Sequence, residues 1–331
     1  MEFDLATFQR ARDLVRKGGV QQTVVKKSTW LSKETGAEVY LKYENQHEGS
    51  SFKVRGATHY LYAHKEKYGE FPKRVVTASG GNHGIAVAVA CSKLKIECLV
   101  FLPNNSVTPS KLYVLETCYG AKVVVEGTCF QEANDSAQKM VTEESTCYIH
   151  PYAHPWIVQG AGTMLLELNE QISNIDVIAA SLGGGGMIAG LITAAKASNL
   201  NIEFVSAETE GADYYYQSVQ RGELITLPKI TSIASTLGAS TGTPESFQLF
   251  TENIKHPLLV SDREAVDALW KLLKNEYCLV EPSCSATIAA LLKYPEIFKG
   301  KRVVVILCGG NPSLDECTAW KKKYLESTDS Q

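Results

Sequence analysis

The feature that most constrains the fold is a repeated alternation of short apolar segments with helical patterns. The apolar segments are rich in β-branched residues and lie at 74–77, 98–102, 121–125, 176–180, 202–206 and 302–307. Helical patterns come between them, at 84–90, after Pro109 and at 187–198. Apolar strands that alternate with helices predict an α/β fold of mostly parallel, twisted sheets flanked by helices.

An interruption of this alternation near His150-Pro151 predicts two α/β domains. We expect the N-terminal segment to join the later domain. The predicted boundaries are residues 1–52 with 151–331 for the large domain, and 53–150 for the small one. The interval between Gly222 and Asp262 carries little periodicity and gives no clear element.

Composition excludes several function classes. The 331 residues are 44% hydrophobic, enough apolar material for one large or two moderate domains. A net charge of −3 without a basic cluster argues against nucleic acid, and no apolar run reaches membrane-spanning length. The acidic start, residues 1–4, lacks a signal-peptide pattern, and the nine cysteines form no Cys-x-x-Cys pair. We therefore expect reduced thiols and a cytoplasmic protein.

Lys53 is the first candidate for chemistry. Its segment, residues 50–57, reads Ser-Ser-Phe-Lys-Val-Arg-Gly-Ala, so its neighbours are small or apolar. Most lysines are solvated surface charges, but this setting favours burial. A desolvated lysine loses basicity and becomes a nucleophile for a Schiff base.

Four consecutive glycines, residues 183–186, follow a predicted strand and open a predicted helix. Free N–H groups and the helix dipole predict a phosphate site there. A dinucleotide site is a rival interpretation, because Gly184, Gly186 and Ala189 satisfy G-x-G-x-x-G/A and Glu208 follows after about 20 residues. A tight turn with close helix packing is a third.

A second loop of the same kind, residues 77–84, reads Thr-Ala-Ser-Gly-Gly-Asn-His-Gly. It offers backbone donors and the Asn82 amide, which suit a carboxylate and a ring hydroxyl. A nicotinamide dehydrogenase has no obvious use for a second anion loop and a buried lysine. The three features together favour pyridoxal phosphate, which carries both an aldehyde and a phosphate.

Five motifs occur in a recognisable order, at 51–57, 79–84, 183–186, 281–283 and 308–311. In this order they resemble the serine/threonine dehydratase family, pyridoxal-phosphate enzymes of the tryptophan-synthase-β fold. The resemblance extends from about Thr23 to Asp315. The segment 227–234 and the following Leu237-Gly238 are most similar to liver-type L-serine dehydratases, and serine racemases are close relatives.

The resemblance implies a cofactor in the cleft between the two domains, with Lys53 as its covalent partner and as the group that moves the α-proton. The implied cofactor-binding residues are Phe52, Lys53, Asn82, Gly183, Gly184, Gly185, Gly186, Met187, Glu281 and Cys308. The implied substrate-binding residues are Ser51, Ser79, Gly80, Asn82 and His83. Cys308 would face the ring nitrogen. A thiol cannot keep that nitrogen protonated as an aspartate would, which favours prompt elimination.

The resemblance also reassigns Glu208 to a cation site beside the cofactor loop. Backbone carbonyls would come from Ala212, Tyr214, Leu237 and Ala239. Racemases that favour a divalent ion place an acid where this chain has Tyr214. We therefore expect a monovalent cation, potassium.

The implied reaction is β-elimination from L-serine or L-threonine, giving ammonia and a 2-oxo acid. Serine racemase and hydroxyaspartate dehydratase are alternatives, and a dinucleotide-binding dehydrogenase is the alternative of another class. Racemases place a serine, which can donate a proton, at the position of Gly80. Gly80 has no side chain and cannot donate one. The family's His-Pro-Phe-Asp-Asp-Pro is His-Pro-Tyr-Ala-His-Pro at 150–155, where His154 is expected to tolerate an acidic substrate. We also expect a homodimer.

Overall fold

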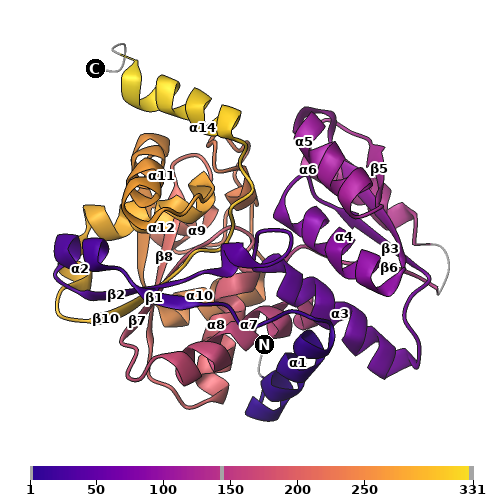
Figure 1. Cartoon of the computed structure of the whole chain (residues 1–331), viewed down its shortest axis with the longest axis horizontal. Helices are drawn as coiled ribbons and strands as arrows, with labels where there is room; N and C mark the ends of the chain where they lie inside the picture. Colours follow the sequence, from indigo (N-terminus) through magenta and orange to yellow (C-terminus); the bar gives the residue numbers. More distant parts are fainter. Residues whose placement is uncertain (1–2, 142–144, 328–331) are drawn as a thin grey trace.

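Two sheets organise the chain, and Figure 1 shows the units built on them lying side by side. The computed structural model describes residues 3–141 and 145–327. Three short segments lie outside the described residues: 1–2, 142–144 and 328–331. The first is part of the acidic start, the second falls in the predicted small domain and the third in the predicted large domain.

The larger sheet has six strands in the order β1-β2-β10-β7-β8-β9. All neighbours pair in parallel except β1 with β2. The strands are β1 (Val25–Lys27), β2 (Glu38–Lys42), β7 (Val177–Ser181), β8 (Glu203–Thr209), β9 (Ile254–Val260) and β10 (Arg302–Ile306). Two strands from the N-terminal segment thus complete a sheet whose other strands come after residue 176.

The smaller sheet is parallel throughout, in the order β5-β4-β3-β6. Its strands are β3 (Arg74–Ala78), β4 (Glu97–Leu102), β5 (Lys122–Val125) and β6 (Thr146–Tyr148). The predicted class, two mostly parallel sheets flanked by helices, is therefore confirmed, whereas the domain boundaries stay a prediction.

Helices cover both sheets. Those before β7 are α1 (Leu5–Lys17), α2 (Thr29–Thr35), α3 (Lys53–Tyr68), α4 (Asn82–Leu94), α5 (Pro109–Leu112), α6 (Phe130–Lys139) and α7 (Pro155–Gln171). Those after it are α8 (Gly186–Ala197), α9 (Tyr214–Arg221), α10 (Pro244–Asn253), α11 (Asp262–Glu276), α12 (Pro282–Lys293), α13 (Pro295–Phe298) and α14 (Leu314–Lys321). In the larger unit α12 packs on β7, β8 and β9, and α7 packs on α8.

Short single-turn segments join several of these elements. They are η1 (Glu44–Gln46), η2 (Asn104–Ser106), η3 (Tyr113–Cys118), η4 (Ser235–Leu237) and η5 (Lys322–Glu326). Segment η1 precedes α3, and segment η4 lies in the interval between Gly222 and Asp262 that carries little periodicity.

Helix α3 belongs to the contact between the two units, because it packs against α7, α4 and α1. Glycines bring α3 and α7 unusually close. A Cβ at Gly160 would lie 2.7 Å from the carbonyl oxygen of Arg55 and 2.7 Å from the Cα of Gly56. Any larger residue at position 160 would push the helices apart.

A buried group of charges fixes the same helix from behind. Arg55 donates from Nε to Glu44 Oε2 at 2.6 Å and from Nη1 to Glu167 Oε1 at 2.8 Å. Lys42 Nζ donates to Glu167 Oε2 at 2.7 Å. All four side chains are almost fully shielded from water. Two cations and two carboxylates thus balance one another where β2, η1, α3 and α7 meet.

Candidate active site

Lys53 is the first residue of α3. Its Nζ donates a hydrogen bond to the carbonyl oxygen of Pro151 at 2.7 Å and lies 5.1 Å from the centre of the Phe52 ring. Desolvation lowers the pKa of Lys53 to about 8, although the nearby Cys308 and Glu281 act in the opposite direction. The amine is therefore available as a nucleophile and base close to neutral pH.

The backbone before Lys53 is tied to the end of β10. Phe52 donates its N–H to the carbonyl oxygen of Cys308 at 3.0 Å, and Ser51 forms a bridge with Gly309. The Ser51 hydroxyl is buried and has no hydrogen-bond partner among the described residues. The lysine and the thiol, far apart in sequence, are thus held together by main-chain contacts.

The Asn82 amide is held at both ends. It lies at the first position of α4, where Nδ2 donates to Glu281 Oε1 at 2.8 Å. Asn311 Nδ2 donates to Asn82 Oδ1 at 2.8 Å and to the carbonyl oxygen of Gly49 at 2.9 Å. The amide of the smaller unit is therefore oriented by side chains of the larger one.

Glu281, at the start of α12, accepts further hydrogen bonds that the sequence did not reveal. Thr236 Oγ1 and Ser283 Oγ each donate to its Oε1 at 2.7 Å, and these two hydroxyls also contact each other. Ser283 and Asn311 belong to motifs that carried the resemblance, so the motifs were the signal. Thr236 comes from the interval without periodicity.

The glycine run lies between β7 and α8, as predicted. Gly185 has a φ of +81°, and no side chain caps the first turn of α8. A Cβ at Gly184 would collide with the ring of Tyr152, and one at Gly185 would lie 2.5 Å from the ring of Phe250. Met187 is buried behind the loop. The turn thus requires glycine and presents backbone N–H groups without side-chain partners.

The loop before α4 is built around glycines as well. Ser79 Oγ accepts from the N–H of Gly81 at 3.2 Å. A Cβ at Gly80 would lie 2.7 Å from the Cβ of Ser106, so this position is crowded. No side chain caps the first turn of α4. The loop can therefore receive an anion through its backbone, but position 80 offers no side-chain donor.

Two histidines near Lys53 are neutral. His83 Nε2 donates to the carbonyl oxygen of Ile149 at 3.0 Å, and its buried Nδ1 has no partner among the described residues. Burial, and secondarily the Lys53 charge, lowers the pKa of His83 to about 3. The same two causes lower the pKa of His150 to about 4. His150 was not among the predicted site residues.

His154 caps the first turn of helix α7. Its Nδ1 accepts from the N–H of Trp156 at 3.1 Å, which caps α7. Its ring packs 4.8 Å from the ring of Tyr60 and 5.1 Å from that of Trp156. This ring lies at the junction of α3 and α7, and the expectation that it would tolerate an acidic substrate stays a prediction.

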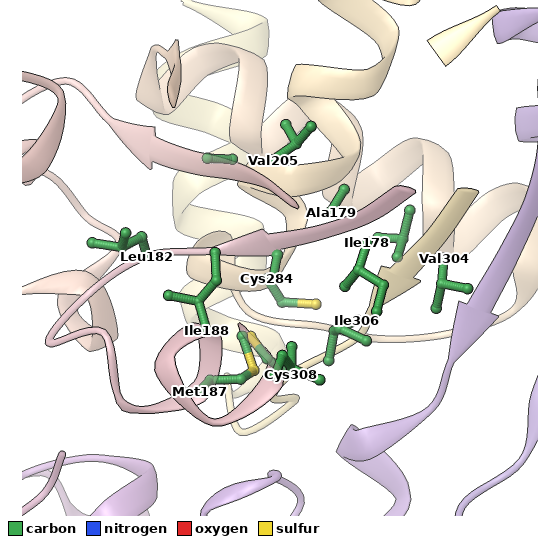
Figure 2. Close-up of a cluster of buried hydrophobic side chains, with 14 of the residues drawn as sticks. Ile178, Ala179, Leu182, Met187, Ile188, Val205, Cys284, Val304, Ile306 and Cys308 are labelled. Carbon is green, nitrogen blue, oxygen red and sulfur yellow. The ribbon is translucent and has the colours of Figure 1, made fainter. Parts of the chain in front are cut away.

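Cys308 follows β10 and lies 3.5 Å from the hydroxyl of Ser181. Cys284, in the first turn of α12, hydrogen bonds to Cys308. Burial and this contact keep the pKa of the Cys284 thiol well above its usual value. Figure 2 shows both cysteines among apolar side chains such as Ile306 and Met187.

Glu208, near the end of β8, is buried and accepts backbone N–H groups from Tyr215 at 3.1 Å and Tyr216 at 2.7 Å. Burial raises its pKa well above the usual value. Among the other predicted cation-site residues, Ala212 bridges to Thr209 and packs with Leu237, while Ala239 N–H donates to the carbonyl of Leu237 at 2.8 Å. The buried Tyr214 hydroxyl has no partner in the described chain.

The described residues hold neither a metal-binding cluster nor a membrane-spanning helix. No group of three or more His, Cys, Asp or Glu side chains could hold a metal ion. No described helix has the length and apolar character needed to span a bilayer.

Comparison with known proteins agrees with this geometry. The model for the family of pyridoxal-phosphate dependent enzymes matches residues 17–309. An L-serine dehydratase of Dictyostelium discoideum is 36% identical over 85% of this chain and 84% of its own. A beta-hydroxyaspartate dehydratase of Paracoccus denitrificans is 32% identical over 91% and 94%. The structure of maize serine racemase superposes with a TM-score of 0.88 at 30% identity, covering 98% of both chains.

These relatives carry three different activities on one fold. The resemblance first seen in the motifs is therefore confirmed over most of the chain, and it removes the support for a dinucleotide site at Gly184, Gly186, Ala189 and Glu208. The chain belongs to the family of pyridoxal-phosphate dependent enzymes.

Proposed function

We propose that this enzyme catalyses β-elimination from L-serine or L-threonine, releasing ammonia and a 2-oxo acid. The observation that carries the proposal is the pairing of a desolvated amine at Lys53 with a side-chain-free position at Gly80. One acid–base group on one side of a substrate suits elimination, which does not need a second proton donor on the other side.

The residues present fit pyridoxal phosphate. The uncapped first turn of α8 and the glycines before it suit a phosphate, and larger residues would fill that cradle. The Lys53 amine has no carboxylate bound to it among the described residues, only a carbonyl. Met187 would complete the phosphate loop, Phe52 would lie against the ring, Asn82 would donate to the ring oxygen, and Cys308 would face the ring nitrogen.

When bound, pyridoxal phosphate supplies the aldehyde that links to an amine and a conjugated ring that accepts an electron pair. The substrate carboxylate is received by the loop 79–84, with Ser51, Asn82 and His83 lining the same place. Lys53 Nζ would take the α-proton of the bound substrate. That proton would pass to the β-hydroxyl, which would leave as water, and a second water would hydrolyse the released enamine to ammonia and the 2-oxo acid.

Lys53 provides the test of the proposal. Borohydride should fix the cofactor to the peptide that contains Lys53. Lys53→Ala should lose both the visible absorbance and elimination, while Lys33→Ala, at an exposed position, should keep both. Because desolvation lowers the pKa of Lys53 to about 8, the apoprotein should capture cofactor faster as pH rises and level off above about 8. Peptide mass spectrometry that finds the label on another lysine would contradict the assignment.

The charges around Lys53 favour a substrate with a neutral side chain. Among the described residues, Glu281 is the carboxylate that acts on the charge of the amine, and the nearby His83 and His150 are neutral. Arg55, two positions after Lys53, is already bound by Glu44 and Glu167. A second carboxylate on the substrate would therefore meet Glu281 without a cation to balance it.

We predict that kcat/KM for L-serine and L-threonine exceeds that for 3-hydroxyaspartate by about 100-fold, the equivalent of roughly 3 kcal/mol. Keto-acid formation from this panel at one pH gives the ratio. L-alanine and L-aspartate, which have no leaving hydroxyl, serve as inhibitor controls, and L-alanine should bind more tightly. Equal or faster turnover of hydroxyaspartate would favour the Paracoccus-type activity.

Serine racemase is the second candidate, and Gly80 argues against it. Inversion needs a proton delivered to the side opposite Lys53, and Gly80 has no group to deliver it. The crowding by Ser106 also matters, because a serine at position 80 would have to displace it.

We predict that L-serine gives pyruvate much faster than D-serine. The double variant Gly80→Ser/Ser106→Gly should raise racemisation relative to elimination, because it adds a hydroxyl and removes the Cβ that crowds it. Ser106→Gly alone is the control and should leave the ratio near that of the parent. Chiral chromatography during turnover measures both products, and D-serine formed as fast as pyruvate by the parent would support a racemase.

We also propose a potassium ion beside Glu208, with carbonyls of Ala212, Tyr214, Leu237 and Ala239. The support is that Glu208 is buried and that, among the described residues, backbone N–H groups of Tyr215 and Tyr216 bind it but no Lys, Arg or His side chain pairs with it. Potassium should activate more than sodium, chelators should have little effect, and Glu208→Ala should weaken cofactor retention. Activity assays in the two chlorides check this, and reversible inactivation by a divalent chelator would contradict it.

We also propose that the enzyme is a homodimer and that it works in the cytoplasm. All nine cysteines are free, which suits a reducing compartment. Light scattering and cell fractionation can test these two points.

A further inference from the structure

One oxygen of Glu281 collects hydrogen bonds from three separate segments. Asn82 comes from α4 in the smaller unit, Ser283 from α12 and Thr236 from η4, with donor–acceptor distances of 2.8, 2.7 and 2.7 Å. Glu281 and Ser283 are buried, whereas Thr236 is exposed. The threonine hydroxyl therefore reaches a buried carboxylate from the surface.

Thr236 also lies beside both glycine loops. If Gly81 carried a Cβ, that atom would lie 3.2 Å from the Thr236 Cγ2. If Gly183 carried one, it would lie 3.1 Å from the Thr236 carbonyl oxygen. A threonine in η4 thus lies where the loop before α4, the loop before α8 and the start of α12 come together.

The orientation of the Asn82 amide depends on this arrangement. Asn82 Oδ1 accepts from Asn311, and Nδ2 donates one of its two hydrogens to Glu281. The second hydrogen on Nδ2 remains for a ligand. If Glu281 Oε1 shifts, the amide can rotate and present its oxygen instead, which would repel an anionic ring oxygen.

We propose that Thr236 is a positioning residue: by donating to Glu281, it keeps the Asn82 amide turned with its N–H toward the cofactor ring. The inference rests on the proposed cofactor site and adds a residue that acts through Glu281. Ser283 donates to the same oxygen, so loss of the Thr236 hydroxyl weakens the arrangement without removing it.

Two substitutions at this one position separate the hydroxyl from the methyl group. Thr236→Val keeps the shape and loses the donor, and Thr236→Ser keeps the donor and loses the methyl. We expect Thr236→Val to raise the dissociation constant of pyridoxal phosphate about tenfold, the effect of one hydrogen bond to a charged acceptor. Thr236→Ser should stay within about twofold of the parent.

Titration of apoprotein with pyridoxal phosphate, followed by absorbance, gives the dissociation constants. The visible spectrum at saturation should change in Thr236→Val and not in Thr236→Ser, since the ring oxygen loses a well-oriented donor only in the former. Melting of the apoprotein is the control for a purely structural effect. Because residue 236 is exposed, the three apoproteins should melt within a few degrees of one another.

A double-mutant cycle with Glu281→Gln tests the route through the carboxylate. Thr236→Val should cost less in the Glu281→Gln background than in the parent. Equal effects in both backgrounds, or equal affinities of the valine and serine variants, would overturn the inference. A parent protein that binds no pyridoxal phosphate would instead refute the proposed function, and the inference with it.

Discussion

The structure depends on the burial of Arg55 between two glutamates. Four charges away from water are tolerated only because Glu44 and Glu167 each meet a cation, and removing one partner of such a pair costs about 3–5 kcal/mol. Lys53 lies half a turn away on the same helix. The charge network that holds α3 in place therefore also fixes the backbone position of Lys53.

The site itself is assembled from both units with little net charge. The smaller unit contributes the loop before α4, and the larger one contributes the thiol of Cys308, the carboxylate of Glu281 and the proposed phosphate loop before α8. The neighbouring histidines are neutral, so Lys53 and Glu281 dominate the local field. Such an arrangement keeps the amine reactive and leaves substrate selection to shape and to the few remaining donors.

The sequence was sufficient for elements whose pattern lies in their own residues. The central strands were found because they are apolar throughout, and the glycine run lies between β7 and α8 as predicted, whereas the roles of Lys53 and of these glycines stay predictions. It failed for β9, where His256 and Pro257 break the pattern, for β2, which contains Glu38 and Lys42, and for the three-residue strands β1 and β6. Thr236 and His150 could not be found, since their positions depend on how distant segments come together.

The place of β10 has a consequence for how the chain folds. This strand pairs with β2 on one side and β7 on the other, yet it comes after every other strand in the sequence. Until residues 302–306 leave the ribosome, the antiparallel pair of β1 and β2 has no strand pairing with β7, β8 and β9. Completion of the larger sheet is therefore a late, long-range event, and the partly folded chain must keep two unpaired strand edges from aggregating in the meantime.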